Sequence, residues 1–338
     1  MNHQALLGRA SDGENLSQDE MAAAVDAIMR GSWSPEEIGL LLTALHHKGE
    51  TVDEVAGAAQ ALRQHMRPIR SSRPDLLDTC GTGGDGSATF NISTAAAIVA
   101  AAAGVPVAKH GNRRMTSRTG SADVLTELGV NIEATVDTVE RCLDELGLAF
   151  CFAPLFHQAM KHVAEVRRKL GFPTIFNLLG PLSNPAGARY QLLGVGRREL
   201  RPLLASALSR LGAQRALVVC GSDGLDEVTL AGSTDVSDTQ SGNVTEFTWT
   251  PQEFGLDPQP LDTLKVDGPA ASAAVIRDIL AGQCGPARDI VVLNAAAALW
   301  TAGRSSDPRA CANQAADAID SGSARELLAN LAAMSHGR

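Results

Sequence analysis

The chain of 338 residues lacks several features that mark large classes of proteins. It has no surplus of basic residues, because 29 Lys and Arg are set against 38 Asp and Glu, for a formal net charge of −9. General nucleic-acid binding depends on clustered cations and is not expected. No uninterrupted apolar stretch reaches bilayer-spanning length, and residues 1–15 lack the apolar segment of a signal peptide. We therefore expect a cytoplasmic protein without nucleic-acid or membrane partners.

The six cysteines lack the close pairing that is typical of metal or redox sites. They lie far apart, none forms a C-x-x-C pair, and several fall within apolar runs such as residues 216–220. We expect them to be reduced core residues. No zinc site is predicted either, since His157 and His162 miss the i, i+4 spacing of a helical zinc pair.

The first part of the chain carries helix signals. Three S/T-x-x-E capping boxes begin at Ser17, Ser34 and Thr51, and each precedes apolar residues at helical spacing. We expect residues 1–70 to form a small all-helical domain, joined by a helical return around residues 155–190.

After a linker near residue 70 the pattern changes to short apolar runs that alternate with helix patterns. This alternation predicts an α/β domain over residues 71–338 with a mostly parallel central sheet. Residues 227–249, rich in Thr, Val and Gly at strand-like spacing, predict an antiparallel excursion at one edge. The expected strands lie within 76–80, 105–109, 148–152, 192–195, 216–220 and 290–293.

A glycine-rich segment, residues 78–86, follows the first expected strand and precedes a helix pattern that includes Ser93 and Thr94. Glycines free the backbone to turn and to approach a ligand closely, and a helix N-terminus attracts anions. The segment fits neither a Walker A loop nor G-x-G-x-x-G. Its Asp85 suits a metal-shielded pyrophosphate or a ribose hydroxyl. The segment predicts phosphate binding, with a simple tight turn as the alternative.

Residues 109–123 follow the next strand and contain four Lys or Arg residues and several hydroxyls. Because ligands of open α/β sheets bind at the carboxyl ends of the strands, this stretch predicts a second anion site beside the first. Ser121 is also expected to cap the helix that follows, which is compatible with ligand binding.

An adjacent carboxylate pair, Asp226 and Glu227, follows the apolar run at residues 216–220. Hard oxygen ligands are those that Mg²⁺ selects, so the pair is a candidate metal site. By themselves two loop acids are more often solvated, and it is the presence of the two predicted phosphate-binding segments in the same chain that favours the metal.

Together these segments resemble the anthranilate phosphoribosyltransferases. The resemblance rests on G-T-G-G-D-G at 81–86, N-x-S-T at 91–94, K-H-G-N-R at 109–113 and G-S-A-D at 120–123, in the order of that family. It extends through residues 159–163, 174–182 and 223–227 and covers nearly the whole chain.

The resemblance implies a helical domain hinged to an α/β domain, as in nucleoside phosphorylases and class IV phosphoribosyltransferases, and a homodimer formed through the helices. It implies Mg²⁺ served by Ser93, Asp226 and Glu227. Gly81, His110, Asn112 and Arg167 would meet anthranilate, with Arg167 chosen over Arg168 by alignment with the family. The implied ligands of phosphoribosyl pyrophosphate are Gly81, Gly84, Asp85, Thr89, Asn91, Ile92, Ser93, Thr94, Lys109, Ser117 and Ser121.

The implied reaction is transfer of a phosphoribosyl group to anthranilate in tryptophan biosynthesis, with release of pyrophosphate. Two alternatives are kept. A pyrimidine nucleoside phosphorylase-like enzyme shares the architecture and attacks the same ribose carbon, but that family has K-H-S-T-G-G in its loop. A non-catalytic nucleic-acid-binding relative is disfavoured by the acidic charge and by the intact loops.

Overall fold

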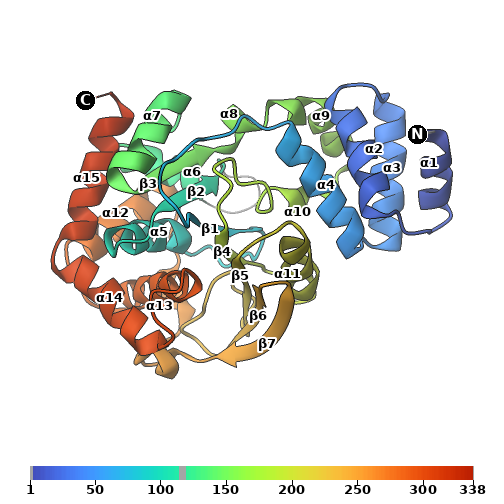
Figure 1. Cartoon of the computed structure of the whole chain (residues 1–338). Helices are drawn as coiled ribbons and strands as arrows, with labels where there is room; N and C mark the ends of the chain where they lie inside the picture. Colours follow the sequence, from blue (N-terminus) through green and yellow to red (C-terminus); the bar gives the residue numbers. More distant parts are fainter. Residues whose placement is uncertain (1–2, 114–118, 338) are drawn as a thin grey trace.

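The computed structural model describes residues 3–113 and 119–337 and contains a helical part and a larger α/β part (Figure 1). The helices are α1 His3–Ser11, α2 Gln18–Met29, α3 Pro35–Lys48, α4 Val52–Gln64, α5 Ile92–Ala102, α6 Ser121–Glu127, α7 Val136–Arg141, α8 Ala153–Phe156, α9 Lys161–Leu170, α10 Phe176–Leu179, α11 Leu200–Arg210, α12 Pro269–Leu280, α13 Pro286–Thr301, α14 Pro308–Asp320 and α15 Ser323–Ser335. The strands are β1 Leu77–Gly81, β2 Val107–Gly111, β3 Leu148–Phe152, β4 Tyr190–Gly194, β5 Arg215–Gly221, β6 Thr234–Gln240 and β7 Asn243–Trp249. Short 3₁₀ or π turns lie at Cys142–Leu146, Gln158–Met160, Pro251–Phe254 and Leu261–Leu264.

The seven strands form one sheet in the order β3-β2-β1-β4-β5-β6-β7. The first five strands in this order, from β3 to β5, run parallel to one another, whereas β6 and β7 add an antiparallel edge. This confirms the predicted helical domain followed by a mostly parallel α/β domain, and the antiparallel excursion within residues 227–249. Because the strand order reverses beside β1, loops from both halves of the sheet meet at the carboxyl ends of β1 and β4.

The strand predicted at residues 290–293 is wrong, because these residues lie inside α13. All four are buried, and so are the alanines that follow at 295–298. A short apolar run does not distinguish a buried strand from a helix that is surrounded by protein.

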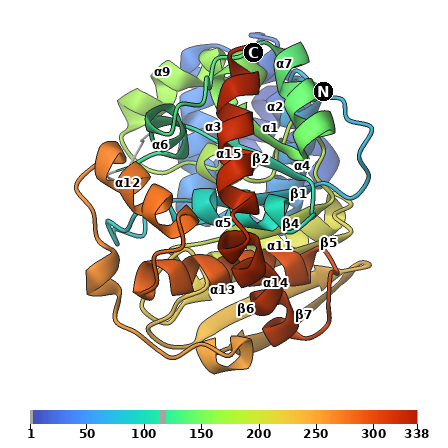
Figure 2. The same ribbon diagram turned by 90° about the vertical axis from the view of Figure 1, so that its left-hand side faces the viewer.

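Each face of the sheet packs into its own core. Along β5, Leu217 and Val219 face the core that contains α5 and α13, while Ala216, Val218 and Cys220 face the core shared with α11. This alternation follows from the two-residue period of a strand. Figure 2 shows α15 and α13 in front of α5 and the sheet.

The helical part adjoins the second of these cores. Residues of α2, α3 and α4 share one buried cluster with Val163 and Val166 of α9, Phe176 of α10 and Leu204 of α11. In Figure 1, α9 lies beside α2 and α3, and α10 lies beside α4.

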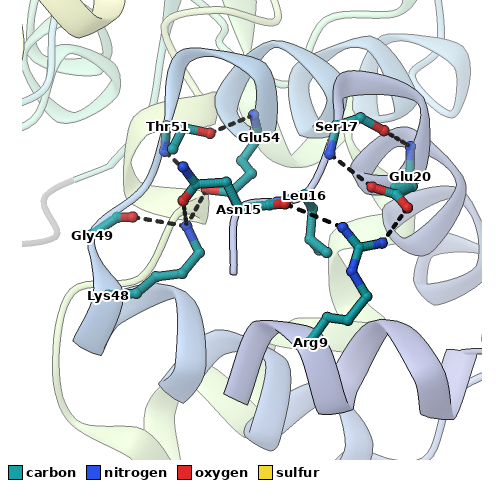
Figure 3. A network of polar contacts seen from close by, with 9 residues as sticks. All are labelled: Arg9, Asn15, Leu16, Ser17, Glu20, Lys48, Gly49, Thr51 and Glu54. Atoms are coloured by element: carbon teal, nitrogen blue, oxygen red, sulfur yellow. Dashed lines mark hydrogen bonds and ion pairs between the residues drawn. The ribbon is translucent and has the colours of Figure 1, made fainter. Parts of the chain in front are cut away.

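All three predicted capping boxes are formed, at Ser17, Ser34 and Thr51. A buried carboxylate joins two of these helix starts (Figure 3). Glu54 accepts hydrogen bonds from the backbone N–H of Leu16 at 2.9 Å and from Lys48 Nζ at 2.7 Å. The charge of Glu54, which is fully buried, is therefore paired.

Five cysteines are buried as expected, but Cys284 is exposed. It lies in the turn between α12 and α13, where Gly282 and Gly285 have φ of 93° and 132° and the chain passes over the surface. Within residues 3–113 and 119–337, no helix has both the length and the apolar character needed to cross a bilayer.

Candidate active site

The glycine-rich loop follows β1 and leads into α5. Gly83, Gly84 and Gly86 have φ of 67°, 82° and 72°, in the left-handed region that glycine adopts without steric cost. A glycine is required at position 81 for a different, steric reason, because a Cβ there would lie 2.6 Å from Asp226 Oδ2. The loop turns sharply and also stays in contact with the loop that follows β5.

The first turn of α5 is already engaged by polar groups. The Ser93 N–H donates to Glu227 Oε1 at 3.0 Å, and Thr94 Oγ1 donates to Asn91 Oδ1 at 2.7 Å. Asn91 Nδ2 donates to Thr119 Oγ1 at 3.2 Å. A helix N-terminus attracts anions through its free N–H groups and dipole. In this protein the carboxylate of Glu227 occupies the N-terminus of α5.

Asp226 and Glu227 lie where negative charges crowd together. Asp226 Oδ2 accepts a hydrogen bond from the Gly83 N–H at 3.0 Å. Burial, and then the charge of Asp85, raises the pKa of Asp226 to about 7. Burial, and then the charge of Asp226, raises the pKa of Glu227 to about 8. Carboxylates that resist ionisation next to one another are stabilised by a cation between them.

The donor set fits Mg²⁺. Carboxylate oxygens are its preferred protein ligands, and Oδ2 of Asp85 is buried without a hydrogen-bond partner in the described part of the chain. Across residues 3–113 and 119–337, no three His, Cys, Asp or Glu side chains gather closely enough to form a complete metal site. Mg²⁺ is usually held by one or two carboxylates together with substrate phosphates, and a partial set of protein ligands suits that arrangement.

The end of β2 places a buried cation opposite these acids. Lys109 Nζ donates to Thr79 O, and it lies 3.3 Å from Ser93 Oγ. Burial lowers the pKa of Lys109, while the nearby charge of Asp78 opposes that shift. The charges of Glu227 and Asp226 also favour the ammonium form, so the cavity wall carries both signs of charge.

His110 is held from both sides of its ring. Its Nδ1 lies 3.1 Å from Gly180 O, and its Nε2 lies 3.2 Å from Nε2 of His157. A carbonyl oxygen only accepts, so Nδ1 of His110 is the donor to Gly180. Burial, and then the neighbouring His157, lowers the pKa of His110 to about 3. His110 is therefore a neutral ring at ordinary pH.

These segments enclose one cavity of about 240 Å³. Ser121, expected as a helix cap, is instead the first residue of α6, with Gly120 at the cap position. Its hydroxyl faces back toward the β2 loop and lies 3.4 Å from Asn112 O. The predicted site residues that line the cavity are Gly81, Asp85, Thr89, Asn91, Ile92, Ser93, Lys109, His110, Asn112, Ser121, Asp226 and Glu227.

Of the predicted residues that the structure describes, Gly84, Thr94 and Arg167 are not among those that line the cavity. Gly84 is in the loop but not on the wall, and Thr94 lies behind Asn91. Ser117 lies outside the described residues. Arg167, on α9, donates to Asn177 Oδ1 at 3.2 Å and lies 5.9 Å from the centre of the Phe176 ring.

Short segments around α10 connect Arg167 to the cavity. Arg167 contacts Phe176 and Asn177, and Gly180, which directly follows α10, accepts from His110. The two parts of the expected anthranilate site therefore meet the same short segment.

Arg113 and Thr119 also line the cavity, although the sequence did not single them out as site residues. Both fall inside the segment 109–123, so their position along the chain was the available signal. His157 was missed for a different reason. Nothing in its local sequence indicates that it packs against His110, 47 residues away.

Comparisons with known proteins agree along the whole chain. The model of the glycosyl transferase family, a/b domain, matches residues 73–325, and that of the helical bundle domain of the same family matches residues 4–66. The anthranilate phosphoribosyltransferase of Rhodopirellula baltica is 51% identical over 326 residues, which cover 96% of this chain and 95% of the relative. That of Moorella thermoacetica is 49% identical, with 96% of each chain covered.

Solved structures give the same picture. The anthranilate phosphoribosyltransferase of Thermus thermophilus superposes with a TM-score of 0.93 at 45% identity, covering 99% of this chain and 100% of the other. The Saccharomyces cerevisiae enzyme in complex with PRPP and Mg superposes with a TM-score of 0.89 at 29% identity, covering 99% and 98%. Its complex with 4-fluoroanthranilate gives 0.88 at 28% identity and covers both chains fully.

Proposed function

The chain belongs to the anthranilate phosphoribosyltransferases, and on that premise we propose how its residues carry out the reaction. The enzyme transfers the phosphoribosyl group of phosphoribosyl pyrophosphate to the amine of anthranilate, giving N-(5-phosphoribosyl)anthranilate and pyrophosphate. The observation that carries the proposal is a single cavity in which a glycine-rich loop, a buried lysine and a carboxylate pair face one another. The product belongs to tryptophan biosynthesis.

Phosphoribosyl pyrophosphate is proposed to lie along the β1 loop and the start of α5. Backbone N–H groups of the loop and the ammonium of Lys109 supply positive charge, and hydroxyl and amide side chains supply hydrogen bonds. The proposed contacts are Gly81, Gly84, Asp85, Thr89, Asn91, Ile92, Ser93, Thr94, Lys109, Ser117 and Ser121.

The cofactor is Mg²⁺, and Ser93, Asp226 and Glu227 are proposed to hold it. When bound, the ion supplies charge neutralisation for the departing pyrophosphate. The raised pKa values of Asp226 and Glu227 mean that the metal replaces protons, so its affinity rises with pH.

Anthranilate is proposed to bind against Gly81, His110 and Asn112, with its carboxylate directed to Arg167. A guanidinium matches a carboxylate in a bidentate geometry. The bond from ribose C1 to pyrophosphate breaks, and the amine nitrogen bonds to C1 from the opposite face and then releases a proton. An aromatic amine needs little activation, and His110, with its pKa near 3, is a positioning group rather than a base.

We also propose the organisation of the molecule. Residues 1–70 and the return around 155–190 form the helical domain, and residues 71–338 form the substrate-binding domain. The helical domain carries a homodimer contact around Leu40 of α3, whose side chain is 58% exposed. The buried free thiols suit a reducing cytoplasm.

Product analysis by mass spectrometry tests the proposal. Protein incubated with anthranilate, phosphoribosyl pyrophosphate and Mg²⁺ should form the phosphoribosyl adduct of anthranilate together with pyrophosphate. Incubation with uridine and inorganic phosphate tests the phosphorylase alternative, and formation of uracil there without any anthranilate adduct would reject the proposal.

A further inference from the structure

Strands β1 and β2 separate just below the active site. Their parallel pairing has one register position, Leu77 with Val107, whereas β1 pairs with β4 along five consecutive residues. The Leu77 N–H donates to Pro106 O at 2.9 Å. If the ladder continued, the Thr79 N–H would next pair with Ala108 O, and the His110 N–H with Thr79 O.

Side chains occupy three of these backbone groups instead. Asn184 Nδ2 donates to Ala108 O at 2.7 Å. The His110 N–H donates to Oδ1 of Asp78 at 3.0 Å, and Lys109 Nζ donates to Thr79 O. The strand ends are therefore held apart, with their polar groups satisfied by side chains.

Asp78 is the acidic member of this bridge and Lys109 is the basic one. It is completely buried, and its Oδ2 lies 3.4 Å from Gln191 Nε2. Gln191 is itself anchored by a bond to Pro181 O at 2.6 Å. The ionisable groups that face Asp78 are Lys109, Cys80 and Cys151, and among them Lys109 supplies the compensating positive charge.

We propose that Asp78 is a positioning residue for phosphoribosyl pyrophosphate, because its carboxylate fixes the end of β2 and counterbalances Lys109 across the separated strands. The inference rests on the proposed role of Lys109 in binding that substrate. In a regular ladder the Thr79 carbonyl would accept from the His110 N–H, whereas here it accepts from Lys109 Nζ. A regular ladder would not require a buried charge at this position. Such a local exception is expected where function outweighs stability.

Glu54 offers a matched control in the helical domain. Like Asp78, it is a fully buried carboxylate that accepts a backbone N–H and lies close to a lysine. Asp78→Asn keeps an oxygen for the His110 N–H but removes the charge, and Asp78→Ala removes both. Glu54→Gln is the corresponding change away from the cavity.

The test is calorimetric titration of phosphoribosyl pyrophosphate with Mg²⁺, alongside thermal unfolding. We expect Asp78→Asn to weaken binding roughly tenfold and Asp78→Ala up to about 100-fold, as for displaced binding groups. Glu54→Gln should lower Tm and leave affinity unchanged. Wild-type affinity in both Asp78 variants, with only a lower Tm, would reduce Asp78 to a structural residue and overturn the inference.

Two further variants separate the remaining outcomes. If the Asp78 variants do not fold, Asn184→Ala tests the same bridge without changing charge, and unaltered affinity there would overturn the inference. Lys109→Ala tests the premise. If that variant binds normally, the proposed substrate site is wrong; if it loses binding while Asp78→Asn does not, only the role of Asp78 fails.

Discussion

The carboxylate of Glu227 accepts a hydrogen bond from the backbone N–H of Ser93 at 3.0 Å. This contact joins the loop after β5 to the first turn of α5 across 134 residues of sequence. A phosphate oxygen and this carboxylate compete for the same N–H unless a cation lies between them. We propose that Mg²⁺ bound at Glu227 relieves this competition when substrate is present.

Gly81→Ala is expected to displace Asp226. The added Cβ would lie 2.6 Å from Asp226 Oδ2, nearer than such atoms approach. We expect kcat/KM to fall roughly 100-fold, as for a catalytic group moved by about 1 Å. Gly8→Ala is the control, because nothing lies within 4 Å of a Cβ on that residue of α1. It should keep full activity, and equal kinetics for the two variants would contradict the close approach.

The His110–His157 pair predicts a stability loss at acid pH. Burial lowers the pKa of His110 to about 3 and that of His157 to about 4, from a usual 6.5. Between the folded pKa values and the usual value of 6.5, the unfolded chain therefore binds more protons than the folded protein. The stabilising contribution is complete above pH 6.5 and is lost as pH falls through the folded pKa values.

Thermal unfolding from pH 7 to pH 4 tests this sign. His157→Gln removes one titrating group and should make the fall in Tm shallower, whereas His336→Gln, at an exposed histidine, should leave it unchanged. An identical pH dependence in the wild type and in His157→Gln would refute the explanation.

The sequence predicted the parts of the structure that depend on neighbouring residues. The capping boxes at Ser17, Ser34 and Thr51 formed because their hydrogen bonds close within four residues. Contacts between distant segments have no such local signal. The approach of Asp226 to Gly83 spans 143 residues, and no local pattern predicts that contact.

Residues 290–293 and Arg167 show the same limit. The apolar run at 290–293 was taken for a strand because four buried residues carry no readable period, and α13 is buried nearly all round. Arg167 was identified from the family alone. Nothing in a basic run on a helix indicates which member meets Asn177.

Arg167→Ala should weaken anthranilate binding specifically. Arg167 is partly buried beside Phe176 and Asn177, whereas the next residue, Arg168, is exposed. We expect the KM for anthranilate to rise roughly 10- to 100-fold in Arg167→Ala, as for loss of a charge-assisted bidentate pair. The KM for phosphoribosyl pyrophosphate should change little. Arg168→Ala should behave as the wild type, and the reverse pattern would move the assignment to Arg168.

Leu40→Asp should disrupt the proposed dimer. Two large hydrophobic side chains are exposed in the described part of the chain, Leu40 at 58% and Val244 at 37%. A charge at a dimer contact opposes association, whereas one on a free surface does not. Light scattering should show a monomer for Leu40→Asp and an unchanged dimer for Val244→Asp. A dimer that persists in Leu40→Asp would place the contact elsewhere.

The most direct test follows anthranilate fluorescence as the purified protein turns over phosphoribosyl pyrophosphate, with Asp226→Asn and Glu227→Gln measured in parallel. The wild type should consume anthranilate only when both Mg²⁺ and phosphoribosyl pyrophosphate are present. Each variant should lose at least roughly 100-fold in kcat/KM. Full activity in the folded variants, or wild-type turnover without Mg²⁺, would contradict the central claim that this carboxylate pair holds the metal at the site of transfer.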